Sequence, residues 1–192
     1  ISPHFLFNTL NSIASLTRSQ PETARILIGK LANLLRQRLK SRDHFLTLRE
    51  ELEAIDQYLD IEVVRFGPQL HVVKQIAPET LDATVPAMII QPLIENSIKH
   101  GLSLKIGGGT VTIRSFRGSD LTVIEVEDDG LGMTDEQLRN AFTAGIGLSN
   151  VNERLSVTYG ANYGLKLTSV RGQGTCARIE IPEMTAAERL TA

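Results

Sequence analysis

The sequence has very little cysteine: Cys176 is the only one among 192 residues. A single cysteine can form no disulfide within the chain and no cysteine-based metal cluster, which fits a reducing cytoplasm. Neither sign of charge is in large excess, because the formal net charge is −2. This balance argues against a protein whose main task is to bind nucleic acid. No unbroken apolar run approaches the ~20 residues that a bilayer-spanning helix needs.

Residues 1–66 are predicted to be helical throughout. Pro3 suits the first position of one helix, and Pro21 opens a second. The string "TLRE" at residues 47–50 forms a capping box and predicts the start of a third helix. The acidic residues Glu51, Glu53, Asp56 and Asp60 are expected on its solvated side. Apolar residues recur at three- and four-residue steps, namely at Leu6, Leu10 and Ile13, at Ala24, Ile28, Leu31 and Leu35, and at Leu48, Leu52, Ile55, Leu59 and Val63.

The second part of the chain alternates short β-rich runs with helical candidates. The predicted strands are "LHVVKQI", "GTVTIRSF", "LTVIEVE", "LKLTSV" and "TCARIEI", and "FRGSD" between two of them predicts a hairpin turn. Helices are expected near residues 86–100 and 147–159. This order favours an α/β sandwich with a mixed sheet.

The first polar cluster is "QPLIENSIKHG", residues 91–101. On a helix, Asn96, Lys99 and His100 share one face. An amide oxygen is a hard ligand that Mg²⁺ accepts, and an ammonium group suits phosphate oxygens. The alternative is an amphipathic helix whose polar side simply faces water.

Two further clusters are rich in glycine. In "EDDGLGM", residues 127–133, a carboxylate at a strand end could accept a hydrogen bond from an amino group, although a plain Asp-Gly turn has the same composition. In "GIGLSNVNERL", residues 145–155, a Gly-x-Gly opens a helix and could present amides to an anion; the alternative is a glycine-rich loop capped by a helix. This pattern lacks the lysine of a P-loop and the third glycine of a dinucleotide fingerprint. A weaker string, "GQGT" at residues 172–175, could be only a hairpin turn.

The order and spacing of these clusters resemble the nucleotide-binding boxes of the GHKL superfamily, which includes gyrase-type ATPases, MutL and histidine kinases. The opening string "PHFLFNTLN" resembles the phosphoacceptor box of LytS-like sensor histidine kinases, and "LREELEAIDQYLDIEVVRFG" resembles the helix that precedes their ATP-binding domain. The resemblance covers nearly the whole chain. It implies an α+β protein with a helical phosphoacceptor and dimerisation segment (residues 1–66), a GHKL (Bergerat) α/β sandwich with a mixed sheet (67–185) and a tail (186–192).

The resemblance also implies roles for single residues. Asn96 would be the Mg²⁺ ligand, with Lys99 and His100 near the triphosphate. Asp128 would hydrogen-bond the adenine amine, whereas Asp129 is given no role. The remaining nucleotide-binding positions are Gly130 and Gly132, which would shape the pocket, Gly145, Gly147 and Leu148 at the phosphates, and Thr175 at the base end. Residues 134–144 fall where these proteins carry a mobile lid.

One position departs from the gyrase-like ATPases. Those enzymes place a water-activating glutamate four residues before the metal asparagine, and here that position is Pro92. The substitution favours transfer to a side chain over hydrolysis. Glu95, directly before Asn96, could support the metal site instead.

The resemblance assigns His4 as the phosphoacceptor. In the first turn of a helix that begins at Pro3, the helix dipole disfavours the imidazolium and helps to keep the ring neutral and nucleophilic. Asn8 and Asn11 follow on the same face, where either could orient the ring. His44 and His71 lie in no recognisable cluster and are expected to be ordinary surface residues.

Together these features predict the cytoplasmic catalytic portion of a bacterial two-component sensor histidine kinase that uses ATP and Mg²⁺. Residue 1 is Ile, and we expect a longer protein anchored in the inner membrane through a segment outside this sequence. A response regulator of the LytTR type and a second copy of the chain are the expected partners. The alternatives are an anti-sigma-type GHKL serine kinase and a non-catalytic GHKL interaction module.

Overall fold

The structure, a computed structural model, describes residues 3–40, 44–103, 105–143 and 146–183. The chain divides into two compact units. Ile1–Asp43 and Leu52–Pro68 form the first, which we call the helical unit, and His44–Glu51 and Gln69–Ala192 form the second, which we call the sheet unit. The sheet unit thus includes residues 44–51, which precede the rest of that unit in the chain. The domain boundary at residue 66 stays a prediction.

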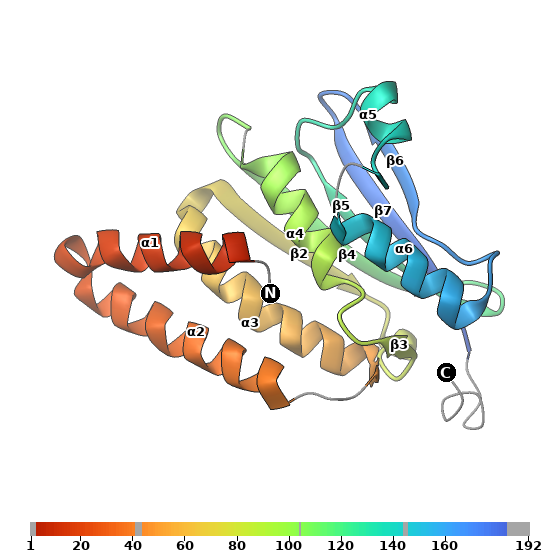
Figure 1. Cartoon of the computed structure of the whole chain (residues 1–192), viewed down its shortest axis with the longest axis horizontal. Helices are drawn as coiled ribbons and strands as arrows, with labels where there is room; N and C mark the ends of the chain where they lie inside the picture. Colours follow the sequence, from red (N-terminus) through yellow and green to blue (C-terminus); the bar gives the residue numbers. More distant parts are fainter. Residues whose placement is uncertain (1–2, 41–43, 104, 144–145, 184–192) are drawn as a thin grey trace. The chain divides into compact units, whose positions relative to one another are not determined.

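The helical unit consists of α1 (Pro3–Ser19), α2 (Pro21–Lys40) and most of α3 (Leu48–Phe66) (Figure 1). Inside this unit the ring of Phe5 on α1 packs against Tyr58 on α3, with ring centroids 4.8 Å apart. Lys30 on α2 forms an ion pair with Asp60 on α3. The predicted capping box at the start of α3 is confirmed: the Glu50 amide donates to Thr47 Oγ1 at 3.2 Å, and the Thr47 amide donates to Glu50 Oε2 at 2.8 Å.

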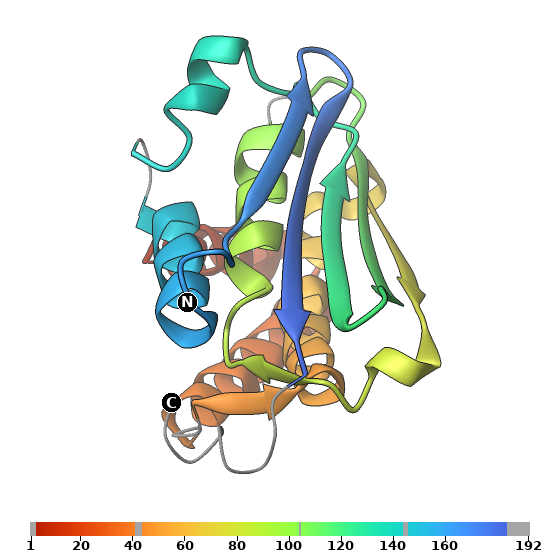
Figure 2. The ribbon, with the colours of Figure 1, turned by 90° about the vertical axis from the view of Figure 1, so that its right-hand side faces the viewer.

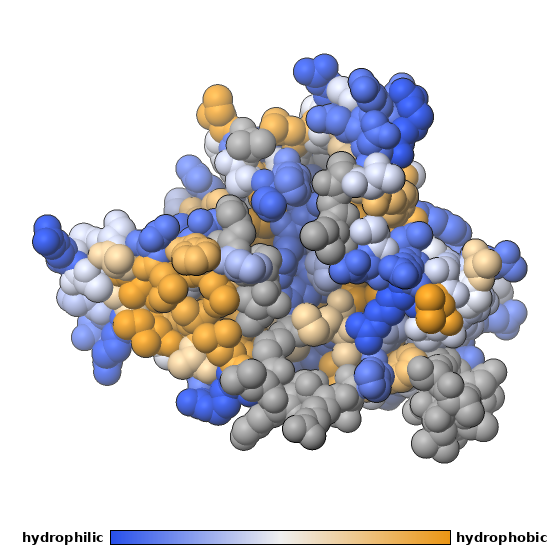
Figure 3. All heavy atoms as spheres, viewed as in Figure 1, coloured by the Kyte–Doolittle hydropathy of each residue, from blue (hydrophilic) through white to orange (hydrophobic). Residues whose placement is uncertain are grey.

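The buried faces of the first two helices differ from the expected ones. In α1 the buried stripe is Phe5, Thr9 and Ile13, while Leu10 is 52% exposed. In α2 the buried residues are Ala24, Leu27, Leu31 and Leu34, while Ile28 is 53% exposed. Apolar side chains are therefore left on the outside of both helices, and Figure 3 shows an apolar area over α1 and α2. The large exposed apolar residues of these helices are Phe7, Leu10, Ile26 and Ile28.

The sheet unit is built on a mixed five-stranded sheet of order β2-β4-β5-β7-β6. β2 pairs with β4 in parallel and the other pairs are antiparallel. The predicted strands and the turn between β4 and β5 are confirmed. The strands are β2 (Leu70–Ile76), β4 (Gly109–Arg117), β5 (Leu121–Asp128), β6 (Lys166–Val170) and β7 (Gly174–Pro182).

A second, two-stranded sheet was not predicted. β1 (Phe45–Thr47) pairs antiparallel with β3 (Thr84–Pro86). The expectation of unbroken helix over residues 1–66 is therefore wrong at β1. Short 3₁₀ turns, η1 (Gly67–Gln69) and η2 (Pro78–Thr80), flank β2.

Helices lie along one face of the five-stranded sheet (Figures 1 and 2). They are α4 (Gln91–Asn96), its continuation η3 (Ser97–Leu102) and α6 (Ile146–Tyr159), with the short α5 (Asp135–Arg139) between β5 and α6 in the chain. The core here is fully buried and includes Leu93 and Ile94 of α4, Ile113 of β4, Ile124 of β5, Leu155 of α6 and Ile179 of β7. Alternation along the strands turns these apolar residues toward the helices.

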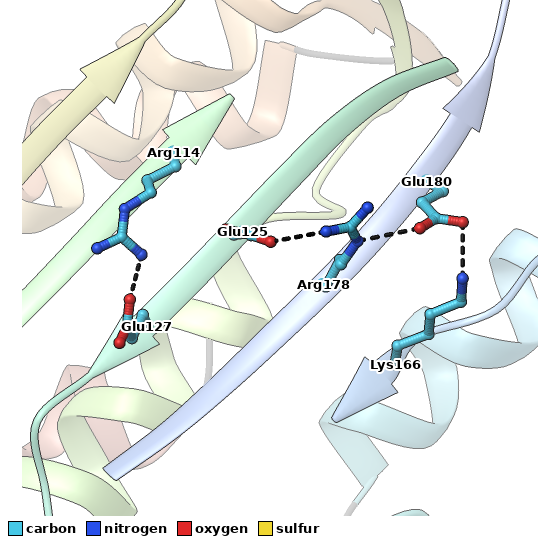
Figure 4. Close-up of polar contacts among 6 residues, drawn as sticks. All are labelled: Arg114, Glu125, Glu127, Lys166, Arg178 and Glu180. Carbon is cyan, nitrogen blue, oxygen red and sulfur yellow. Dashed lines mark hydrogen bonds and ion pairs between the residues drawn. The ribbon is translucent and has the colours of Figure 1, made fainter. Parts of the chain in front are cut away.

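The other face of the sheet carries charged residues in register across neighbouring strands (Figure 4). Arg178 on β7 contacts Glu125 at 3.1 Å and Glu180 at 3.0 Å, and Lys166 on β6 contacts Glu180 at 2.7 Å. Arg114 pairs with Glu127 between β4 and β5. Cross-strand pairs of opposite charge favour this register.

Candidate functional site

The α-helix that carries Asn96 continues as a π-helix after that residue. α4 ends at Asn96, and η3 continues from Ser97 to Leu102 as a π-helix, in which the Ser103 amide donates to the Ile98 carbonyl at 2.9 Å. The helix begins at Gln91 rather than near residue 86, where β3 lies instead. π-turns occur frequently at functional sites. Asn96 is half-buried, and Lys99 and His100 are exposed on the π-helical part.

Asp128 ends β5 and is only 3% exposed. The amide of Gly130 donates to Asp128 Oδ1 at 3.0 Å. Burial raises the pKa of the Asp128 carboxyl, while hydrogen bonds from Gly130, from the Ser97 side chain and from the backbone of Thr175 act in the opposite direction. Asp128 is paired with Thr175 across β5 and β7. A buried carboxylate at a strand end, held by short local contacts, is well suited to accept a hydrogen bond from a ligand amine.

Glycines make this close packing around Asp128 possible. A Cβ atom on Gly101 would stand 2.5 Å from Asp128 Oδ1, and a Cβ on Gly130 would stand 2.3 Å from the Gly101 carbonyl oxygen. Gly174, with φ +110°, lies so close that a Cβ would be 1.8 Å from the Asp128 carbonyl oxygen. The Leu131 amide donates to the Gly101 carbonyl at 3.1 Å, which ties the β5 loop to the end of η3. The sequence motifs include all three glycines but assign a role only to Gly130.

A second set of contacts holds the loop after Asp128. Gly132 has φ +62°, and a Cβ on it would lie 2.0 Å from the Val170 carbonyl oxygen. The Met133 amide donates to Ser169 Oγ at 2.8 Å, and that oxygen lies 2.9 Å from Thr175 Oγ1. Ser169, which had no predicted role, thus links the loop to the Thr175 end of β7.

Two acidic residues near the site have structural partners. Glu95 Oε1 accepts a hydrogen bond from Gln91 Nε2 at 2.7 Å, and Gln91 is 1% exposed. Asp129 accepts from the Thr110 amide at 2.9 Å and from Lys105 Nζ at 3.0 Å. Burial acts to raise the pKa of Asp129, but these contacts with Thr110 and Lys105 outweigh it and lower the pKa. Asp129 therefore holds the neighbouring loop rather than standing free in the site.

The remaining predicted positions are distributed as follows. Gly147 lies in the first turn of α6, where a Cβ would be 3.9 Å from Pro92 Cβ, and Leu148 is buried. Gly145 lies outside the described residues. The predicted lid segment contains α5, which is capped by Thr134 and Gln137. His4 lies in the first turn of α1, in the helical unit, and Asn8 follows one turn later.

Glu51 corrects the expectation for the acidic residues of the third helix. Its exposure is 2%, and its carboxylate accepts hydrogen bonds from the amides of Met88 at 2.9 Å and Ile90 at 3.1 Å. The prediction of a solvated Glu51 is therefore wrong. Glu53 and Asp60 are exposed as expected, and Asp56 is half-buried.

The donor set of the sheet unit fits a magnesium nucleotide. Asn96 offers one amide oxygen, and Lys99 and His100 add donors on the same helical stretch. Mg²⁺ characteristically takes one or two protein oxygens and completes its shell with phosphate oxygens and water. Asp128 offers a buried acceptor for a base amine.

Comparison with known proteins identifies the family. Residues 81–185 match the family described as "Histidine kinase-, DNA gyrase B-, and HSP90-like ATPase", and residues 1–70 match the family described as "Histidine kinase". The chain belongs to the histidine kinase family. Its two matched parts are those of the catalytic region of sensor histidine kinases. The match at residues 1–70 favours this family over the serine-kinase alternative.

Similar proteins cover nearly all of the chain. YwpD of Bacillus subtilis is 36% identical over 98% of this chain and 70% of its own length. The sensor histidine kinases BtsS of Escherichia coli and YesM of Bacillus subtilis are 35% and 34% identical over 95% of this chain. The chain spans 32% of the length of BtsS and of YesM.

Solved histidine kinase structures share the fold. The histidine kinase domain of the blue-light activated kinase from Erythrobacter litoralis EL346 aligns with a TM-score of 0.58 and 20% identity, over 97% of this chain and 95% of that one. The catalytic domain of the histidine kinase ThkA aligns with a TM-score of 0.59 and 15% identity, over 73% of this chain and 99% of that one. The predicted fold class is confirmed. Within the parts of the chain that the structure describes, no helix is both long and apolar enough to cross a bilayer.

Proposed function

We propose that the sheet unit binds MgATP beside α4, η3 and the end of β5, and that His4 accepts the γ-phosphoryl group. The observation that carries the proposal is Asp128, a carboxylate that is 3% exposed at a strand end and is closely surrounded by glycines. Hydrogen bonds offset only part of the cost of burying this carboxylate, because its pKa stays raised. Recognition of the adenine amine gives this carboxylate a function that folding alone does not require.

Different residues of the sheet unit bind different parts of the nucleotide. Asp128 accepts the hydrogen bond of the base amine, with Thr175 and the Gly130–Gly132 loop beside it. Asn96 would hold Mg²⁺, and Lys99 and His100 would contact the triphosphate. Gly147 and Leu148 lie in the first turn of α6, whose amides and dipole favour phosphate oxygens. Gly145, outside the described residues, is proposed as a further phosphate contact.

His4 attacks the γ-phosphorus through one ring nitrogen. The N–P bond forms as the bond from the γ-phosphorus to the bridging oxygen of ADP breaks, and the ring proton passes to solvent. Mg²⁺, when bound, neutralises charge on the phosphates. His4 lies in the first turn of α1, where the helix dipole and free amides favour a phosphoryl dianion. Asn8, one turn later, orients the ring, and Glu95 supports α4 through Gln91.

The intact protein has further expected partners. We propose that phospho-His4 passes its phosphoryl group to an aspartate of a response regulator of the LytTR type. The exposed apolar residues of α1 and α2, Phe7, Leu10, Ile26 and Ile28, fit a homodimer interface. We also propose that the chain is the cytoplasmic part of a sensor anchored in the inner membrane.

Incubation of the 192-residue chain with γ-labelled ATP and Mg²⁺, followed by mapping of the labelled residue, tests the function. We expect label on His4 that is lost in acid and retained in base, since phosphohistidine is acid-labile and phosphoserine is not. Acid-stable label on a serine would instead support an anti-sigma-type kinase. Nucleotide affinity without any label, in this chain and in one extended upstream, would support a non-catalytic binding module.

A further inference from the structure

The turn before α4 is held by side chains from two other helices. The Met88 and Ile90 amides both donate to the carboxylate of Glu51, at 2.9 and 3.1 Å. Glu51 belongs to the first turn of α3, and it is 2% exposed. Ile90 is the residue before α4, and its carbonyl oxygen accepts from the Leu93 and Ile94 amides. Glu51 therefore fixes the point from which α4 starts.

Arg154 of α6 holds the same turn from the other side. Its Nη1 donates to the Ala87 carbonyl at 2.5 Å, and its Nη2 donates to the His44 carbonyl at 3.2 Å. The Ala87 amide also donates to the His44 carbonyl at 2.9 Å. One guanidinium thus bridges two carbonyl oxygens that belong to segments far apart in the sequence. The planar fork of arginine suits such a contact, whereas a lysine ammonium is a single point charge.

The backbone of the turn is strained at one residue. Met88 has φ +62°, and among the described residues it is the one non-glycine residue with positive φ. A side chain with a Cβ adopts this region at a cost, and the surrounding contacts must maintain it. The hydrogen bond from the Met88 amide to Glu51 is such a contact.

We propose that Glu51 and Arg154 are positioning residues that set the start of α4, and through it the place of the metal ligand Asn96. Asn96 follows Ile90 by six residues on the same short helix. Displacement of the helix start therefore moves Asn96 relative to β5, which carries Asp128. The inference rests on the proposed function, because it concerns the Mg²⁺ end of the proposed ATP site and not the base end.

The test compares Glu51→Gln with Glu53→Gln in the 192-residue chain. The glutamine amide group would present a donor to a backbone donor in place of one carboxylate oxygen. Glu53 lies on the same helix and is exposed, so its replacement is a matched control. For Glu51→Gln we expect the Mg²⁺ concentration that gives half-maximal ATP binding to rise about tenfold. ATP affinity in EDTA should change less than about twofold, because Asp128 stays in place.

Three further variants separate positioning from general stability. Met88→Gly removes the conformational penalty of the turn. The double variant Glu51→Gln, Met88→Gly should therefore need less Mg²⁺ than Glu51→Gln alone. Arg154→Met should shift the Mg²⁺ dependence in the same direction as Glu51→Gln, and Arg154→Lys should lie between Arg154→Met and wild type. Thermal unfolding of each variant shows whether it is folded. If Glu51→Gln does not fold, the Mg²⁺ dependence is measured on Arg154→Lys instead.

The outcomes distinguish this inference from the proposed function. Wild-type protein that binds no ATP would overturn the proposed function and the inference together. Wild type that binds MgATP, with Glu51→Gln and Arg154→Met showing the same Mg²⁺ dependence as wild type, would overturn the positioning role alone. A fall in ATP affinity that is equal with and without Mg²⁺ would also overturn it, since that result indicates a general loss of structure.

Discussion

Gly101 and Asp128 lie so close that a Cβ atom on the glycine would stand 2.5 Å from Oδ1 of the carboxylate. The two residues come from different elements, the π-helix η3 and the strand β5. The same π-helix follows directly on Asn96. The elements that carry the proposed base-binding and metal-binding groups therefore meet at a close approach that only glycine permits.

Gly101→Ala tests this contact. The added methyl group must displace the Asp128 side chain, so we expect ATP affinity to fall at least about tenfold and the free energy of unfolding to fall by about 1–3 kcal/mol. Isothermal titration with ATP and chemical unfolding measure the two effects. Gly29→Ala is the control, because a Cβ there meets nothing within 4 Å. Since Gly29 lies inside α2, that change should stabilise the protein by about 0.5–1 kcal/mol. ATP affinity that is unchanged in Gly101→Ala would contradict a role for this contact.

Asp128→Asn separates stability from binding. Burial raises the pKa of Asp128 above its ordinary value of 3.8, so the folded protein keeps a proton that the unfolded chain releases just above that pH. The contribution of Asp128 to the free energy of unfolding therefore falls as the pH rises through this window. Without nucleotide, Asp128→Asn should melt at or above the wild-type temperature at pH 7 and should lose this part of the pH dependence. Its ATP affinity should fall by about tenfold or more, because an acceptor for the base amine is replaced by a donor. If Asp128→Asn is less stable than wild type and binds ATP with wild-type affinity, Asp128 serves the fold and does not bind the base.

His4→Gln tests the phosphoacceptor. Glutamine retains a polar side chain at the start of α1 but offers no nucleophilic ring nitrogen. We expect acid-labile label from γ-labelled ATP to fall below detection and ATP affinity to stay within about twofold of wild type, because His4 belongs to the helical unit and the proposed nucleotide site to the sheet unit. His44→Gln is a suitable control, since His44 is exposed and accepts hydrogen bonds from Ala87 and Arg154 through its backbone carbonyl. Label that persists in His4→Gln would mean another acceptor.

Asn96→Ala tests the metal ligand. Removal of the amide oxygen should abolish the gain in ATP affinity that Mg²⁺ provides and reduce autophosphorylation by about a hundredfold or more. Affinity for ATP in EDTA should remain, since Asp128 is untouched. Titration of ATP with and without Mg²⁺ gives both values. An Asn96→Ala variant that still responds to Mg²⁺ would place the metal elsewhere.

The sequence predicts most of this fold because its periodic patterns are strong. The five long strands follow from alternation and turn residues, and the third helix from its capping box. The buried face of α1 was predicted wrongly because it contains Thr9, whose hydroxyl bonds the Phe5 carbonyl at 2.9 Å within the helix, while Leu10 stays outside. An apolar pattern cannot distinguish a core face from an exposed apolar one.

Other features depend on contacts distant in sequence. Glu51 looks like a surface carboxylate, and only the amides of Met88 and Ile90, more than thirty residues later, make its burial favourable. The role of Gly101 follows from the approach of Asp128, a residue of another element. The motif residues themselves remain predictions of site function that the experiments above address.

The strand β1 has a consequence for any attempt to isolate the nucleotide-binding half of the protein. Phe45–Thr47 is the partner of β3, yet the chain reaches it before α3, and the rest of that half resumes only after Pro68. A fragment that begins after α3 would lose one of the two strands of the small sheet together with the Glu51 carboxylate that anchors the turn before α4. Complete excision needs a start at or before residue 44, so α3 must remain attached, and the two halves of this kinase are interleaved rather than arranged in series.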